Sequence, residues 1–265
     1  MSIDADPSSG QSAVPPATPV KCPLGYDQHP VFISYRVSSD SSFVEKLAPY
    51  LQSVWFLKKL GLGPEHISLL PHIFFDKYCL VGGTLWEDSF LAALKTSKLI
   101  ILVISPDALV GINSTRDNMF LEWEWAVELQ QQGQARIMPL LLATEDPSSG
   151  SIQPFSLFQL DRFPDELHQH PESPKQRTIR ETMRMIFAIQ GLQVNSSNTE
   201  QYRSAIADAY MQVFDLAHLV KSRPLPSLIA KDQRVARTSV SKTISRTDED
   251  GTTIEVSTKL SCNVM

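Results

Sequence analysis

Three features are scarce in this sequence: cysteine, long apolar runs and net charge. The cysteines are only three, Cys22, Cys79 and Cys262, and this odd, widely spaced set predicts neither a disulfide framework nor a metal site. Such a set fits a reducing, intracellular compartment. The best apolar run, Leu99 to Ile104, is far too short to cross a bilayer. The N-terminus is acidic and has no apolar segment of the signal-peptide kind, so we expect a cytoplasmic protein.

The charge balance argues against nucleic acid as a partner. The formal net charge is -5 and the isoelectric point is near 5.7, so no basic surface dominates. Hydrophobic residues make up 42% of the 265 positions, which is enough for a substantial core. The length allows one large domain or two small ones.

Strand-like and helix-like patterns alternate from residue 30 onward. We expect strands at 31–35, 72–76, 98–105 and 136–142, a short fifth strand within 155–163, and helices at 42–55, 86–96, 117–132, 175–190 and 199–220. The connection at 58–71 has room for a short helix of its own. This alternation predicts an α/β fold with a parallel sheet covered on both faces. Ligands of such sheets bind at the carboxyl ends of the strands.

The composition divides the chain into four segments. Residues 1–28, rich in proline, serine and alanine, read as a disordered leader. The main domain is expected at 29–190, followed by a helical extension at 191–220 and a flexible tail at 221–265. Apolar residues alternate with polar ones on both sides of Asp250-Gly251, as in a hairpin, but an isolated hairpin is only marginally stable. We therefore expect the tail to be mostly disordered.

The helix expected after Asp117 holds one glutamate out of step with its neighbours. An α-helix turns about 100° per residue, which gathers five residues on one apolar face: Met119, Phe120, Trp123, Ala126 and Val127. Glu124 and Glu128 lie on the opposite side of the helix, so we expect both to be solvated. Glu122 lies at the edge of that face, where a carboxylate lowers the stability of the fold. Such a position is therefore explained best by a functional role. The simpler alternative is that the methylene groups of Glu122 pack against the apolar face while its carboxylate reaches water.

Four segments in this order resemble the boxes of a known family. They are Val31-Phe32-Ile33-Ser34-Tyr35-Arg36, Phe75-Asp76 with the loop to Gly83, Trp86-Glu87-Asp88, and Leu102 to Leu109. Over roughly residues 29–190 the chain resembles TIR domains, and within them the TIR NAD glycohydrolases of animal axon degeneration, bacteria and plants. The resemblance implies a flavodoxin-like, three-layer TIR fold with a five-stranded parallel sheet, and we expect disordered termini on either side.

The resemblance also implies a site. Glu122, followed by Trp123 and then Ala126, fits the position of the catalytic glutamate. Tyr35 and Arg36 would lie near the nucleotide, and Trp86 near the nicotinamide. The BB loop would include Asp76, Leu80, Gly82 and Gly83. NAD+ would be the substrate, with no cofactor and no metal.

Other interpretations of these residues stay open. Arg36 alternatively caps the sheet edge, Asp76 orders the BB loop, and Trp86 packs rather than stacks. The pair Asn118-Met119 and a BB loop one residue longer depart from the family pattern. Five of the six histidines show no metal or catalytic spacing and are interpreted as structural: His66, His72, His168, His170 and His218.

Two functions follow, and both involve self-association and binding to other TIR domains. The first is cleavage of NAD+ to nicotinamide and ADP-ribose or a cyclic product. The nicotinamide leaves as a neutral group, so a single carboxylate suffices to stabilise the ribose cation. The second is a non-catalytic adaptor that acts through the loop from Lys77 to Leu85.

The last four residues, Cys262 to Met265, match a prenylation box, and the terminal methionine favours farnesyl. One lipid on a weakly basic tail predicts reversible, peripheral membrane attachment.

Overall fold

The computed structural model describes the residues at 22, 26, 28–80, 86–113, 116–146, 148–195, 198–220, 241–247 and 253–259. They fall into two compact units, one up to Lys221 and one from Ser222 onward. Each unit is considered by itself.

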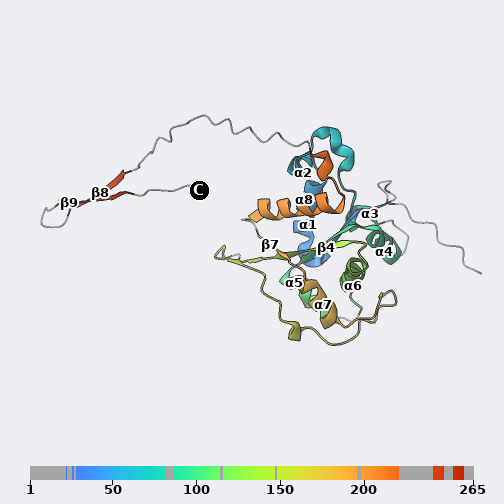
Figure 1. The fold of residues 1–265 in the computed structure, drawn as a ribbon. Coiled ribbons are helices and arrows are strands. Elements are labelled where there is room, and N and C mark those ends of the chain that lie inside the picture. The colour runs from blue at the N-terminus through green and yellow to red at the C-terminus, as the bar shows by residue number, and fades with distance from the viewer. Residues whose placement is uncertain are drawn as a thin grey trace, which may run out of the picture. The chain divides into compact units, whose positions relative to one another are not determined.

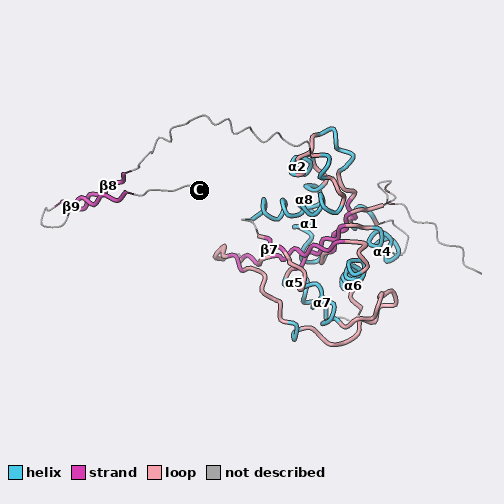
Figure 2. Tube along the Cα trace, in the orientation of Figure 1, coloured by secondary structure: helices cyan, strands magenta, loops and turns pink. Residues whose placement is uncertain are grey.

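A five-stranded parallel sheet forms the centre of the first unit (Figures 1 and 2). Its strands, in the order β2-β1-β3-β4-β7, are Ile73–Phe74, Val31–Ser34, Leu99–Ile104, Arg136–Leu142 and Leu192–Val194. β3 is buried along its whole length because it has a partner strand on either side and helices above and below. The predicted α/β fold with a parallel sheet is confirmed.

Helices cover both faces of the sheet, as Figure 1 shows. One face carries α1, α2 and α8, which span Val37–Leu51, Val54–Lys59 and Thr199–Val213. The other carries α4, α6 and α7, which span Trp86–Thr96, Asn118–Gln131 and Ile179–Phe187. Alternation along the strands explains the two cores: Ile101 packs with the first layer, whereas Ile100 packs with the second.

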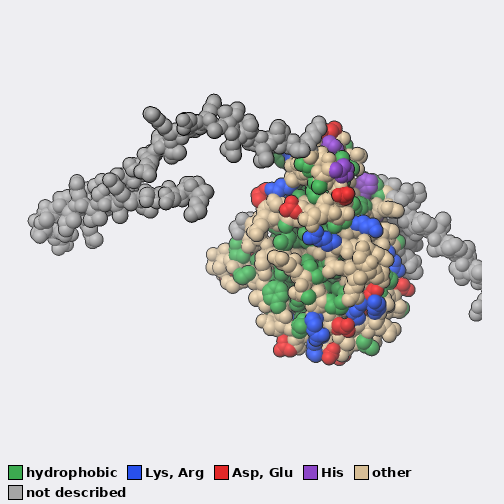
Figure 3. Space-filling view, viewed as in Figure 1, with side chains coloured by type: hydrophobic (Ala, Val, Ile, Leu, Met, Phe, Trp, Pro, Cys, Tyr) green, Lys and Arg blue, Asp and Glu red, His purple; other side chains and the backbone are tan. Residues whose placement is uncertain are grey.

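Shorter elements complete this unit. They are α3 at Asp76–Cys79, α5 at Pro106–Val110, the strand pair β5 and β6 at Thr144–Glu145 and Ile152–Gln153, and 3-10 helices at Pro64–Leu69, Gly111–Asn113, Leu160–Arg162 and Ala217–Leu219. Among the described residues, no helix has both the length and the apolar character that a bilayer crossing requires. On the face drawn in Figure 3, acidic and basic side chains are interspersed.

The fifth strand was predicted in the wrong place. Residues 155–163 form a loop and a 3-10 helix, and the edge strand β7 lies at Leu192–Val194. Gly191 permits the close approach of β7 to β4, because a Cβ there would meet Leu141 Cδ1 at 2.8 Å. Both β7 and α8 therefore pack in the same compact unit as the elements before residue 190.

The two ends of the chain also differ from expectation. Cys22 is buried, so at least this part of the expected disordered leader packs against the core. In the second unit, β8 (Ser241–Thr247) pairs antiparallel with β9 (Thr253–Lys259), with Ser241 opposite Lys259. The hairpin alternative for the tail is thus formed. Cys262 lies outside the described residues.

Candidate functional site

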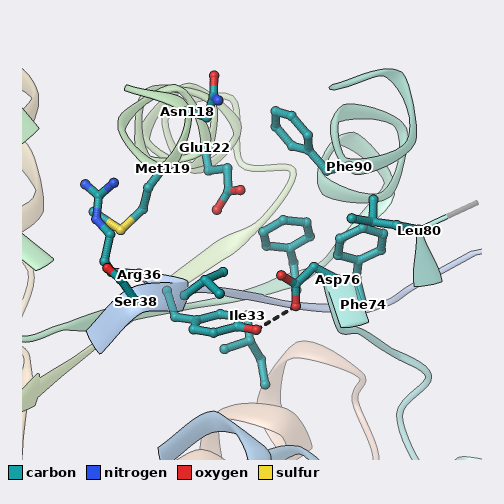
Figure 4. A pocket seen from close by; sticks show the side chains of 13 residues that line it. Ile33, Arg36, Ser38, Phe74, Asp76, Leu80, Phe90, Asn118, Met119 and Glu122 are labelled. Atoms are coloured by element: carbon teal, nitrogen blue, oxygen red, sulfur yellow. Dashed lines mark hydrogen bonds between the residues drawn. The ribbon is translucent and has the colours of Figure 1, made fainter. Parts of the chain in front are cut away.

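A cavity of about 550 Å³ opens at the carboxyl ends of β1 and β2, beside the first turns of α6 (Figure 4). This is the size range of small-molecule sites. Its lining mixes aromatic and apolar side chains with a few polar ones: Phe32, Ile33, Tyr35, Arg36, Val37, Ser38, Phe74, Asp76, Leu80, Phe90, Asn118, Met119 and Glu122.

Glu122 projects from α6 toward the cavity. Its Oε2 accepts a 2.5 Å hydrogen bond from the Ser34 hydroxyl, which in turn accepts one of 3.0 Å from the indole N–H of Trp123. This chain of bonds fixes the orientation of the carboxyl group. Burial raises the pKa of Glu122 to about 8, and Asp76 adds to the rise, whereas the bond from Ser34 opposes it. The residue is nevertheless only partly buried, because its carboxyl group faces the cavity.

The start of α6 is held at the cavity by Asp117. Its Oδ1 accepts a 2.8 Å bond from the backbone N–H of Phe120, so Asp117 is the N-cap of α6. Its Oδ2 forms a 2.7 Å ion pair with Arg36, which follows β1. The Arg36 guanidinium also donates to the carbonyl of Ala108 at 3.3 Å. Arg36 therefore lies at the rim of the cavity, and Asp117 balances much of its positive charge.

Tyr35 and Asp76 form a second polar pair across the cavity floor. The phenol donates a 2.6 Å hydrogen bond to Asp76 Oδ1, drawn as the dashed line in Figure 4. Burial, and then this bond, raises the pKa of Tyr35, so the phenol stays protonated at neutral pH. Asp76 also accepts a bond from the backbone of Lys77, which supports the view that Asp76 orders the start of the BB loop.

Glu124 and Glu128 are not solvated, and that prediction is wrong. Glu124 is fully buried and forms a 2.6 Å hydrogen bond with Nδ1 of His168. Burial opposes ionisation of Glu128, but hydrogen bonds from Lys175 and Arg177 outweigh it and lower its pKa. The segment before α7 covers the side of α6 that the helical pattern had left to solvent, which explains the error.

Most of the predicted site residues that the structure describes come together. Tyr35, Arg36, Asp76, Leu80 and Glu122 all line the cavity. Trp86 begins α4, but its side chain lies outside the described set, as do Gly82, Gly83 and Cys262.

Sequence reasoning missed several residues of the site. The Ser34 hydroxyl donates a hydrogen bond to the Glu122 carboxyl group, and Phe90 faces that group across the cavity. Ser34 had a usable signal, since it is the polar residue that ends an apolar strand at the ligand edge. Phe90 had none, because a phenylalanine on a helical face reads as core.

A partly buried carboxyl group, aromatic walls and an arginine at the rim suit a ligand with a flat ring, a positive charge and phosphate. Carboxylate and cation attract more strongly here than in water, since the surroundings are less polar. Of the described residues, one set of neighbouring metal ligands emerges, Cys22, His29 and Cys79, and none of the three lines the cavity.

Comparison with known proteins agrees with this geometry. The model of the TIR domain family matches residues 31–170, which is more than half of the chain. A metazoan TIR-STING receptor from C. gigas aligns with a TM-score of 0.32 and 18% identity over 86% of this chain and 70% of that one, a likeness too low to carry an argument. A search of curated proteins finds no match. The family match and the parallel five-stranded sheet establish that the chain belongs to the TIR domain family, a family of signalling domains.

Proposed function

We propose that this TIR domain cleaves NAD+ between the ribose and the nicotinamide, with Glu122 as the catalytic carboxylate. The observation that carries the proposal is the carboxyl group of Glu122, which is oriented by Ser34 and faces a ligand-sized cavity at the carboxyl edge of the sheet. The resemblance of the surrounding residues to TIR NAD glycohydrolases supports the same assignment.

The bond between C1′ of the ribose and the nicotinamide nitrogen breaks, and its electron pair leaves with the nicotinamide, which becomes neutral. The ribose then carries a positive charge at C1′ and O4′. Ionised Glu122 stabilises this charge, and water adds to C1′ and loses a proton, giving ADP-ribose. A cyclic product forms instead when a nucleophile of the same ligand reaches C1′ first. No general acid is needed, so the protonated phenol of Tyr35 has a binding role.

The pKa of Glu122 sets the pH dependence. With a pKa of about 8, only about one molecule in ten carries the ionised form at pH 7 before substrate binds. The positive nicotinamide ring favours that form once NAD+ is bound. Because kcat/KM reports on the free enzyme, it is expected to rise about tenfold per pH unit up to pH 8 and then level off.

The test is nicotinamide release by the purified full-length chain over a range of protein concentrations, since self-association is part of the proposal. Glu122→Gln keeps the shape and a hydrogen bond to Ser34, and it should lower kcat by at least about 100-fold. Glu181→Gln, an exposed glutamate on α7, is the matched control and should leave turnover unchanged.

Retention of full turnover in Glu122→Gln would disprove the role of Glu122. A wild-type chain that assembles but never releases nicotinamide would instead favour the adaptor function. Tyr78 belongs to an adaptor surface in that case, because it is 54% exposed in α3, at the start of the loop from Lys77 to Leu85.

A further inference from the structure

Three side chains that the catalytic proposal does not use form a compact cluster behind the cavity wall. Cys22, His29 and Cys79 each offer one metal-ligand atom, and these atoms all lie within 4.8 Å of one another. All three residues are buried, with 6%, 6% and 2% of their surface exposed. Buried thiols and imidazole at such distances point to a built site rather than to a chance surface grouping.

The chain before β1 is positioned by specific contacts. The backbone N–H of Cys22 donates to the carbonyl of Tyr26 at 3.3 Å, which ties these two residues together. The ring of Tyr26, a described residue, lies 3.7 Å from that of His72, centroid to centroid. The hydroxyl of Ser97 donates to the carbonyl of His29 at 2.7 Å. Two of the three potential ligands are therefore held by the folded core.

The third ligand is fixed by α3. Cys79 is the last residue of this helix, and its Sγ accepts a 3.5 Å bond from the backbone N–H of Phe75 while it donates to the carbonyl of Ile73 at 3.7 Å. Its sulfur thus has a defined place at the base of the BB loop.

His29 has a buried nitrogen atom that a bound metal ion would satisfy. Its Nε2 is buried and has no hydrogen-bond partner within the described part of the chain. Buried polar atoms without a partner are rare because they lose water and gain nothing. Burial, and then the neighbouring His72, lowers the pKa of His29, so the imidazole is neutral at pH 7, the form that binds metal ions.

We propose that Cys22, His29 and Cys79 bind one zinc ion. Tetrahedral zinc, with bonds of about 2.3 Å to sulfur and 2.0 Å to nitrogen, places its ligand atoms roughly 3.5–3.8 Å apart. The ligand atoms in the structure lie up to 4.8 Å apart, so they would have to approach one another by about 1 Å to bind zinc. Rotation of the side chains can supply this movement. Two thiolates and an imidazole suit zinc, whereas calcium and magnesium prefer oxygen ligands. The fourth coordination position is left for water or another ligand.

A disulfide between Cys22 and Cys79 is the competing interpretation. Both cysteines are free in this structure, and the Cys79 thiol donates to the carbonyl of Ile73 rather than pairing with Cys22. A zinc ion binds thiolates, because its charge displaces the thiol protons. Zinc binding therefore releases protons, and its affinity should fall in acid.

The ion would connect two parts of the molecule that are far apart in sequence. It would join the segment before β1 to α3, whose first residue, Asp76, bonds Tyr35 in the cavity. Leu80, the next residue after Cys79, lines the same cavity. Zinc would thus stabilise one wall of the proposed NAD+ site without contacting the substrate.

The test uses the full-length chain, stripped of metal with a chelator and kept in a reductant that does not bind metal. Titration with zinc against a chromophoric competitor should show one ion per chain. Cobalt should give the visible and charge-transfer bands of tetrahedral thiolate ligation. Cys79→Ser and His29→Gln should each weaken zinc binding by at least tenfold, whereas the matched controls Cys262→Ser and His218→Gln, the latter at an exposed position, should not.

Failure of the wild-type chain to bind zinc would overturn the proposal, as would an equal loss in Cys262→Ser. If the ligand variants misfold, the melting temperature of the wild-type chain tests the proposal instead. It should rise when zinc is added and fall again when a chelator removes the zinc. Zinc that binds without raising the melting temperature would contradict a buried site. None of these measurements depends on nicotinamide release, so a failure of the zinc proposal can be distinguished from a failure of the proposed function.

Discussion

Glu122→Gln should make the protein more stable at pH 8 but not at pH 4.5. The folded-state pKa of Glu122 is about 8, against a model value of 4.5 for the unfolded chain. Between these values the native state binds more protons than the unfolded state, so the free energy of unfolding falls as the pH rises. Glutamine resembles the protonated acid and does not titrate, and the substitution therefore removes this loss.

The magnitude follows from the size of the pKa shift. A difference of 3.5 units, from 4.5 to 8, corresponds to about 5 kcal/mol once the carboxyl group is fully ionised. Glu122 opens onto the cavity, however, and water there solvates the carboxylate. We therefore expect about 2–3 kcal/mol at pH 8, roughly half of the full value. For a domain of this size that is roughly 5–10 °C in melting temperature.

Urea unfolding of both proteins at pH 4.5, 6 and 8 measures the effect, with zinc content held constant. The two free energies should agree at pH 4.5 and diverge steadily toward pH 8. Glu181→Gln, at an exposed position, should follow the wild type throughout. A gap between Glu122→Gln and the wild type that does not change with pH would refute the reasoning, because it would show that Glu122 titrates alike in both states.

Two further predictions concern features outside the cavity. Glu124→Ala should lower the free energy of unfolding by about 2–3 kcal/mol, because it leaves buried His168 without its hydrogen-bond partner; chemical denaturation measures this, and an unchanged midpoint would show that the pair contributes nothing. Cells fed a farnesyl analogue should label the wild-type chain but not Cys262→Ser, and equal labelling of the two would exclude the prenylation box.

The sheet could be predicted well because its strands carry strong local signals. The run from Leu99 to Ile104 is continuous and apolar, as a strand covered on both faces requires, and it became the central strand β3. The edge strand at Leu192–Val194 has only three residues, too few for a pattern. The phenylalanines within 155–163 were apolar enough to imitate a strand, but Phe155 and Phe163 instead pack on the ring of Phe187.

The site was partly predictable for a similar reason. Helical geometry, which is local, places Glu122 at the edge of the apolar face, and the resemblance to TIR domains implies its place at the ligand-binding edge of the sheet. The burial of Glu124 depends on His168, which lies 44 residues away and gives no local sign of its partner. The same limit hid the cluster of Cys22, His29 and Cys79. Cys22 lies in a segment expected to be disordered, His29 is the first residue of the expected main domain, and Cys79 lies in an expected loop.

The short strands at the two edges of the sheet restrict how copies of the domain can join. β2 has two residues and β7 three, so neither edge offers a long row of free backbone donors and acceptors to an incoming strand. Growth of a continuous sheet from one molecule to the next is therefore disfavoured. Contacts between copies of this domain would then involve side chains of helices and loops, and such contacts can be reversed by single substitutions or by changes in salt.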